Sequence, residues 1–327
     1  MKAKLTLLAT VIINTVYLSQ KKDSTSTKTM VYIAEKFPIT RVLNIEYNQL
    51  TPYTFSSKLR DKELPEAKVK DFYRAKMSAN INLIRKQKFV LSANLNYRYV
   101  SANTEMYDHT GNGFLIRKGD YHYHSEGLTL NYFSKLFNKM MIYSASASVD
   151  GSEQHFERLR GIATATMVLK ADAKTKMTAG LLVAIDPTVQ TPVIPILTYE
   201  HKFSNGLIAD VILPKNVYLR KKITENSRLS IGSELDMTSF YLYNIDNTNK
   251  KYEFRQIEIN SGLMYEHYLG HSFVATFKGG AKSMMKSRLF EKSASYGSYI
   301  FQANPHAAFY VNLGLSFDPF IKKTAGR

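Results

Sequence analysis

Histidine is the residue type in this chain whose spacing suggests metal chemistry. His122 and His124 stand two residues apart, so in a strand both imidazoles would lie on one face. No acidic partner accompanies them at a fixed spacing, which makes the pair a weak metal candidate. The competing interpretation is a wet strand at the rim of a sheet, with Tyr121 and Tyr123 pointing to lipid. Two further histidines in neighbouring loops would complete a site, His109 and His155.

Motifs for catalysis are missing from the sequence. It contains no Gly-x-Ser-x-Gly elbow, no His-Glu-x-x-His and no glycine-rich phosphate loop. We therefore predict no catalytic residue, no metal site and no cofactor. An outer-membrane hydrolase is the least favoured of the functions considered below.

Charged residues recur instead on one face of alternating segments. In Phe89–Tyr99 the odd positions are apolar and the even positions after Val90 are polar. Successive side chains of a strand point to opposite faces, so this segment has one apolar and one polar face. Its length fits the roughly 9–11 residues with which a tilted strand crosses a bilayer. If the apolar faces meet lipid, these residues point into a lumen: Glu46, Lys76, Arg98, Asp210, Glu234, Asp236, Glu258, Glu266, Lys278 and Lys282.

Similar segments follow one another along the chain. They predict an all-β fold, a single antiparallel transmembrane barrel of about fourteen strands, with twelve as the alternative. The predicted strands cover residues 39–50, 69–84, 89–99, 121–134, 139–149, 160–170, 177–185, 193–203, 207–213, 217–223, 228–243, 252–267, 272–286 and 307–317.

The predicted connections alternate in length. Those near residues 86, 137, 173, 205, 226 and 270 are short, and those near 60, 110, 154, 189, 247 and 295 are mostly longer and more polar. Residues 51–68, 101–120 and 287–304 are predicted to be the longest loops. This asymmetry is typical of outer-membrane barrels, with short periplasmic turns and longer extracellular loops. An even strand count would place both termini on the periplasmic side.

Proline placement agrees with a barrel. Pro192, Pro195 and Pro214 cannot donate to a ladder, and the predicted strands put all three near the outer rim. The alternative fold is a secreted β-sandwich or soluble barrel. Such folds usually have strands of ~5–6 residues, whereas many segments here have eleven or more.

The ends of the chain have a different character. Lys2 and Lys4 precede an apolar run and then a polar stretch, a pattern typical of a secretory signal peptide. We predict a signal peptide at 1–19, a periplasmic leader at 20–38, the barrel at 39–320 and a tail at 321–327. The competing interpretation of the apolar run is a buried N-terminal strand or helix.

The amino-acid composition narrows the classes of molecule that the protein would contact. The formal charge is +17, and removing Lys2 and Lys4 leaves 17 − 2 = +15. These cations are scattered over turns and strand ends, so contact with anionic lipid explains them better than nucleic acid does. There is no cysteine, which excludes disulfides and a lipid-bearing N-terminal cysteine.

Several segments resemble a known group of proteins. Pro192–Tyr199, Phe203–Gly206, Asp210–Pro214 and Gly232–Leu235 look like an uncharacterised family of outer-membrane β-barrels from Bacteroidota. The resemblance covers most of the mature chain and implies a location and a fold, but no activity. The tail departs from the habit of ending on an aromatic residue, and Phe317 or Phe320 would serve that purpose.

Taken together, these patterns lead to three functional hypotheses. The first is a monomeric outer-membrane barrel that forms a narrow or gated passage, or a binding site, for a small solute. The second is a closed structural barrel whose external loops bind a partner, and the third is the hydrolase.

Overall fold

The computed structural model describes residues 36–107, 114–186, 188, 189, 191–245 and 249–319. The predicted signal peptide, most of the leader and the tail lie outside these residues, as does His109. Among the described residues, no helix has the length and apolar character needed to cross a membrane. A short 3-10 helix, η1 (Pro38–Thr40), precedes sixteen strands: β1 (Leu43–Leu50), β2 (Tyr53–Leu59), β3 (Lys62–Arg85), β4 (Phe89–Tyr107), β5 (Phe114–Leu136), β6 (Lys139–Gly151), β7 (Phe156–Ala171), β8 (Thr175–Ile185), β9 (Val193–Lys202), β10 (Leu207–Leu213), β11 (Asn216–Thr224), β12 (Ser227–Tyr243), β13 (Lys251–Gly270), β14 (Phe273–Glu291), β15 (Tyr299–Pro305) and β16 (Ala308–Phe317).

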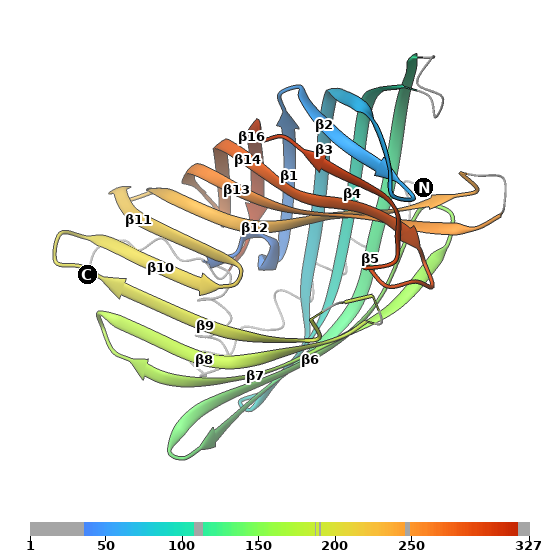
Figure 1. The fold of residues 1–327 in the computed structure, drawn as a ribbon. Coiled ribbons are helices and arrows are strands. Elements are labelled where there is room, and N and C mark those ends of the chain that lie inside the picture. Colours follow the sequence, from blue (N-terminus) through green and yellow to red (C-terminus); the bar gives the residue numbers. More distant parts are fainter. Residues whose placement is uncertain (1–35, 108–113, 187, 190, 246–248, 320–327) are drawn as a thin grey trace, which may run out of the picture.

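All strands belong to one antiparallel sheet that closes on itself (Figure 1). Closure comes from β1, which pairs with β16 on one side and with β3 on the other. β2 continues β1 along β3, and β15 continues β16 along β14, each after a two-residue break. The ring therefore has 16 − 2 = 14 strand positions, which confirms the predicted all-β barrel and its approximate size.

The ring has an apolar outer face and a polar inner face. On β16 the odd residues Phe309, Val311, Leu313 and Leu315 are exposed on the outside, whereas Asn312 between them is buried. The same alternation in neighbouring strands gives a belt of exposed aliphatic and aromatic side chains around the ring. Water would not favour so large an exposed apolar surface.

The two ends of the ring differ. We call the end that carries the chain ends of β1 and β16 the short-turn end, and its connections are residues 86–88, 137–138, 172–174, 203–206, 225–226 and 271–272. The opposite end is the loop end. Two of its connections are as tight as any at the short-turn end, Arg60–Asp61 and Pro214–Lys215.

Three predicted loops are mostly strand. Residues 51–68 form β2, a tight turn and the start of β3, and Arg60 and Asp61 adopt φ values of 47° and 68° in that turn. β4 and β5 extend well into 101–120, and β14 and β15 occupy most of 287–304. The loop predictions were wrong because these extensions carry charges and prolines and have no continuous apolar face. Pro65, for example, lies at an irregularity between β2 and β3, where its missing N–H is tolerated.

At one level of the sheet, the alternation of inward-facing and outward-facing residues shifts in four neighbouring strand positions. β3 has one extra residue between Val69 and Asp71, and β14 has one between Met284 and Ser287. The breaks at 51–52 and 306–307 lie at the same level of the sheet. Bulges bend strands and increase their twist. Above this level the sheet therefore bends away from the regular wall below it.

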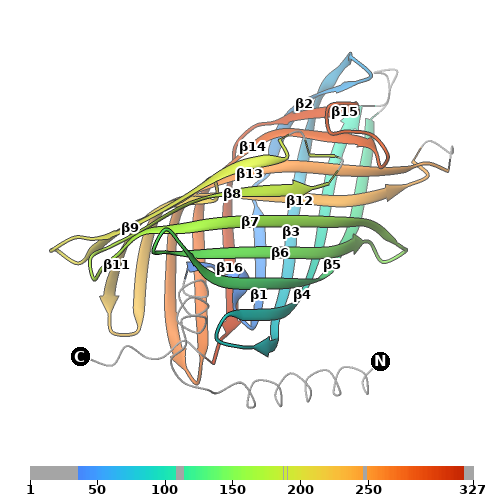
Figure 2. The same cartoon turned by 90° about the horizontal axis from the view of Figure 1, so that it is seen from below.

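The wall is lowest on the opposite side. β9, β10 and β11 have 10, 7 and 9 residues, whereas β3 has 24. β12 pairs with β11 up to Glu234, and the Leu235 N–H still donates to the Lys215 carbonyl, so among the described residues only 236–243 lack a strand partner on that edge. This part of β12 is free to cross the barrel mouth. In the view of Figure 2, β12 and β13 project next to β7, and the two walls meet at their loop ends, where Arg158 of β7 donates to Glu253 of β13 at 2.7 Å.

Candidate functional site

A cluster of inward-facing charges crosses the middle of the lumen. We call it the mid-lumen cluster, and it contains Glu46, Arg74, Lys76, Arg98, Glu234, Asp236, Glu258, Lys278 and Lys282. Strand alternation places them there, because each occupies the polar face of its ribbon. Eight of the nine were predicted from the sequence to face the lumen, and Arg74 was missed.

Asp236 and Glu258 link opposite walls. Asp236 on β12 accepts hydrogen bonds from Arg74 Nη2 at 3.0 Å and from Lys76 Nζ at 2.6 Å, both on β3. Glu258 on β13 accepts from Arg74 at 3.2 Å and also pairs with Lys282. β3 and β12 are not neighbours in the sheet. The ion pairs of Arg74 and Lys76 therefore cross the lumen, whereas Glu258–Lys282 joins neighbouring strands of the wall.

The other two carboxylates of the cluster are also engaged. Lys278 Nζ donates to Glu234 Oε1 at 2.9 Å, and the Tyr218 hydroxyl donates to Glu234 Oε2 at 3.0 Å. Glu46 accepts from Asn44 at 2.9 Å and from Asn312 at 3.2 Å. Every carboxylate of the cluster thus has a partner.

Arg98 is the exception among the cations. Its guanidinium lies 5.4 Å from the centre of the Tyr123 ring. Its Nε and Nη1 atoms are buried and have no hydrogen-bond partner in the part of the chain that the structure describes. Its cross-strand neighbours are Lys76 and Tyr123, neither of which supplies a negative charge.

The short-turn end of the lumen is crossed by residues 36–41, which we call the strap. Lys36 pairs with Glu200 on β9 and, at 2.8 Å, with Asp210 on β10. Arg41 Nη2 donates to Glu266 on β13 at 2.8 Å, and its Nη1 donates to Ser316 on β16 at 2.7 Å. In ring order, β9 lies seven positions from β1 in either direction. The strap therefore reaches from the wall where β1 begins to the wall directly opposite.

Two predicted lumen residues belong to this end. Asp210, besides Lys36, lies 2.6 Å from Arg220 Nε, and Glu266 also pairs with Arg228. Both acids are buried, at 1% and 5% exposure. They therefore hold the strap and line the wall at the same time.

The loop end is closed by a second ionic cluster. We call it the clasp, and it contains Asp150, Arg158, Arg160, Asp186, Glu253 and Arg255. Glu253 on β13 is fully buried and accepts from Arg158 at 2.7 Å, from Arg160 at 3.1 Å and from Arg255 at 2.6 Å. Since Arg158 and Arg160 lie on β7, the clasp joins two walls that are six positions apart in the ring.

Asp186 ties the β8–β9 connection into the clasp. Its carboxylate accepts from the Thr188 backbone N–H at 2.9 Å and from the Thr188 hydroxyl at 2.7 Å, and it pairs with Arg160. Burial acts to raise the pKa of Asp186, but the Thr188 hydrogen bonds and the guanidiniums of Arg160 and Arg158 outweigh it. The pKa of this carboxyl is therefore lowered, and the charged form is favoured.

Aromatic rings pack beside the clasp. Phe240 on β12 is stacked between Tyr121 of β5, at a centroid distance of 4.1 Å, and Phe254 of β13, at 4.7 Å. The Tyr241 hydroxyl donates to Asp150 Oδ1 at 2.7 Å. Residues 238–241 of β12 are all buried, so both faces of the strand are covered here.

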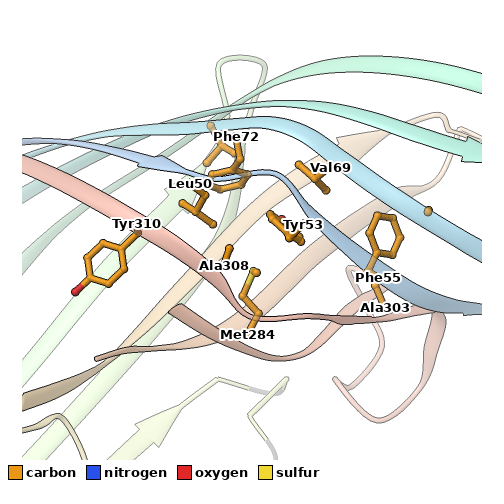
Figure 3. Packing of buried hydrophobic residues seen from close by; sticks show 11 residues of the cluster. Leu50, Tyr53, Phe55, Val69, Phe72, Met284, Ala303, Ala308 and Tyr310 are labelled. Atoms are coloured by element: carbon orange, nitrogen blue, oxygen red, sulfur yellow. The ribbon is translucent and has the colours of Figure 1, made fainter. Parts of the chain in front are cut away.

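An apolar core fills the remaining side of the loop end (Figure 3). It is built by the neighbouring positions β14, β15–β16, β1–β2, β3 and β4. Its members lie on both sides of the level at which the strands bend: Leu50, Tyr53, Phe55, Ala67, Val69, Phe72, Val100, Met284, Ala303, Ala308 and Tyr310. Clasp, aromatic stack and core together occupy the loop end of the lumen.

The histidine pair lies on the outer face of β5. The Tyr97 hydroxyl is 2.7 Å from His122 Nδ1, and His124 Nε2 is 2.8 Å from the Ser152 carbonyl oxygen. The prediction that Tyr121 and Tyr123 point to lipid was wrong, because they face inward to Phe240 and to Asp150. In this part of β5 the odd-numbered side chains face inward and the even-numbered ones face outward, the reverse of that expectation. Among the described residues, no three His, Cys, Asp or Glu side chains gather in a metal-binding group.

Neither the strap nor the clasp was predicted from the sequence. Arg158 and Glu253 are 95 residues apart, and no local spacing connects them. One signal was present, because Glu157, Arg158 and Arg160 place charges on both faces of β7 at its start. A strand end that is charged on both faces cannot lie in hydrocarbon, so it must be paired or solvated.

Comparison with known proteins identifies the family of this chain. A family described as a domain of unknown function (DUF6268) matches residues 43–318. The chain belongs to this family. No curated protein matches it.

Several solved structures of outer-membrane proteins share parts of the DUF6268 chain's topology at low similarity. The COG4313 outer membrane channel of Pseudomonas putida F1 has 9% identity, a TM-score of 0.34, and coverage of 84% of this chain and 94% of that one. The transport unit of the autotransporter AIDA-I from Escherichia coli has 11% identity, a TM-score of 0.34, and coverage of 90% and 97%. The outer membrane protease OmpT from Escherichia coli has 8% identity, a TM-score of 0.26, and coverage of 84% and 96%. At these scores, none of them carries an argument about function.

Proposed function

We propose that this DUF6268 chain is an outer-membrane β-barrel that forms a gated passage for a small solute. The observation that carries the proposal is the division of one closed ring into an apolar outer face and a charged inner face. A closed ring leaves no unpaired edge, as hydrocarbon requires. We further propose that the short-turn end faces the periplasm and that the barrel acts as a monomer.

Barrel size supports a passage. Eight strands leave room only for side chains, and sixteen or more leave an aqueous channel. Fourteen positions fall between these limits, so the lumen is wide enough to need the crossing ion pairs that fill it. Those pairs are non-covalent and involve side chains of opposite walls, and such contacts can separate when a wall moves.

The apolar core of the loop end favours a second candidate function. A permanently closed barrel would use such a core for stability, and its loops would then bind a partner. The clasp argues for opening instead, because burying six charged groups stabilises a fold less than apolar packing of similar volume does.

Single-channel recording in planar bilayers separates the two functions. We expect wild-type protein to be mostly closed with brief openings, and Glu253→Gln to increase the open fraction severalfold because the clasp loses its central acceptor. Glu126→Gln, on the exposed outer face, is the matched control. If neither the wild type nor Glu253→Gln gives steady current, the barrel is closed and the passage is wrong.

A further inference from the structure

Two guanidinium nitrogens of Arg98, Nε and Nη1, are buried without a hydrogen-bond partner among the described residues, and they are the starting point for the first inference. Buried polar atoms almost always have hydrogen-bond partners, and an exception calls for an explanation such as an ion. The carboxylate of Asp236 already accepts hydrogen bonds from Arg74 and Lys76. Glu258 accepts from Arg74, Lys282, Thr238 and Gln256. No carboxylate of the mid-lumen cluster is left for Arg98.

The net charge of the mid-lumen cluster also indicates that one cation has no carboxylate partner. The mid-lumen cluster has five cations (Arg74, Lys76, Arg98, Lys278 and Lys282) and four carboxylates (Glu46, Glu234, Asp236 and Glu258), a net charge of 5 − 4 = +1. An uncompensated charge inside a protein is costly. A bound anion would remove this cost.

We propose that Arg98, with Lys76 beside it, binds the carboxylate or phosphate group of a small anionic solute in the lumen. The guanidinium fork matches either group, and the Tyr123 ring holds the fork from one side. Lys76 is directly opposite Arg98 in the register of β3 and β4 and contributes a second positive charge. This inference rests on the proposed passage, since it names the class of solute.

Isothermal titration calorimetry of the full chain in detergent micelles tests it, with inorganic phosphate and acetate as separate probes. We expect saturable binding of at least one probe, and a loss of affinity of tenfold or more in Arg98→Gln. Lys170→Gln changes an exposed residue near the end of β7 that is paired with Asp172, and this variant should bind as the wild type does. The probe that binds more tightly identifies the preferred group.

A thermal-unfolding measurement guards against a merely structural effect. Without anion, Arg98→Gln should unfold at a temperature equal to or above that of the wild type, because it removes an unpaired charge. Unchanged affinity in Arg98→Gln, or no binding of either probe to the wild type, would overturn the site. Because calorimetry needs no transport, this failure is distinct from a failure of the passage.

The strap carries a second, independent inference. Lys36 and Arg41 are 6% and 2% exposed, although they belong to a short irregular segment that precedes the first strand. The carbonyl of Ile39 between them accepts from Ser78 Oγ at 3.1 Å and from Asn80 Nδ2 at 2.7 Å. The segment is thus fixed at both ends and at its middle.

We infer that the strap is a tethered gate over the short-turn end of the lumen. The wall residues around it are balanced without it, since Glu200, Asp210 and Glu266 face Lys176, Arg220 and Arg228. Release of the strap would therefore leave no net charge behind on the wall. A contact that can open without stranding charge is suited to reversible movement.

Labelling of a lumen cysteine tests the gate. The chain has no cysteine, so Asn96→Cys on the inner face of β4 introduces a single thiol. We expect a small charged maleimide to react at least tenfold faster when Lys36→Gln and Arg41→Gln are added. Lys170→Gln should leave the rate unchanged, and circular dichroism should confirm that the barrel is intact.

An unchanged rate in the folded double variant would overturn the gate. Labelling reports access to the lumen and not passage through it. The result therefore stands whether or not the barrel conducts.

Discussion

The two halves of this barrel follow different rules. In the short-turn half, most side chains alternate between an apolar outside and a polar inside, with a few buried apolar exceptions such as Val90, Met264 and Val274, and each strand pairs with both neighbours. In the loop-end half, β12 and β13 are buried on both faces and contact β5 and β7 across the lumen. The environment of the outer face therefore decides the pattern. Where protein covers that face instead of solvent or lipid, strict alternation is lost.

Removal of the central carboxylate of the clasp should have the largest effect on the loop-end half. In Glu253→Gln, three guanidiniums lose their shared acceptor inside the protein. Breaking a buried ion pair costs about 3–5 kcal/mol, and we expect a loss of that size in the free energy of unfolding. Denaturant titration in micelles, followed by circular dichroism, measures it. Glu126→Gln should change the value by less than about 0.5 kcal/mol, and equal losses would show that the clasp is not special.

The aromatic stack should give the next largest effect. Phe240→Ala removes the ring held between Tyr121 and Phe254. A buried Phe to Ala change costs about 3 kcal/mol or more, and the same titration measures the loss. Phe137→Ala is the matched control, because Phe137 is 82% exposed in a short turn. If the stack were instead exposed to water in the membrane-bound protein, both variants would lose a similar amount of unfolding free energy.

Much of the short-turn half could be predicted from the sequence, and little of the loop-end half could. The strand predicted at 207–213 coincides with β10, because its ends are marked by Ser204–Gly206 and Pro214. The predicted loop at 51–68 is two paired strands, because its stability comes from β15 and the apolar core, which are distant in sequence. The lumen acids Asp210 and Glu266 were visible as polar-face residues, but their partners Lys36 and Arg41 were not. Nothing in residues 36–41 alone indicates that they cross a lumen.

A single hydroxyl gives a smaller and more local test. Tyr241→Phe keeps the ring but removes the donor to Asp150, which is fully buried. Leaving a buried acceptor with one partner fewer costs about 1–2 kcal/mol. Tyr132→Phe, on the exposed outer face, should be nearly neutral. A neutral Tyr241→Phe would mean that Arg160 and Tyr123 are enough to satisfy Asp150.

Acid should loosen the clasp. The pKa of Asp186 is lower in the folded chain than its usual value of about 3.9. A lowered pKa contributes stability that is present above the unfolded value and lost as pH falls through the folded value. The protection of the Thr188 amide, which donates to Asp186, should therefore fall below about pH 4 when the hydrogen-exchange rate is corrected for its intrinsic pH dependence. Asp186→Asn should remove most of that pH dependence, and an unchanged profile would assign the effect to other carboxyls.

The contrast between the halves presupposes that hydrocarbon surrounds the ring, and spin labels can test this directly. A nitroxide at Leu313→Cys lies on the outer face of β16, and one at Asn312→Cys lies on the inner face. In liposomes, we predict that oxygen relaxes the label at 313 far more than a water-soluble nickel complex does, with the reverse preference at 312. If both labels respond alike to the nickel complex, the apolar face is not covered by lipid, and the membrane barrel is contradicted.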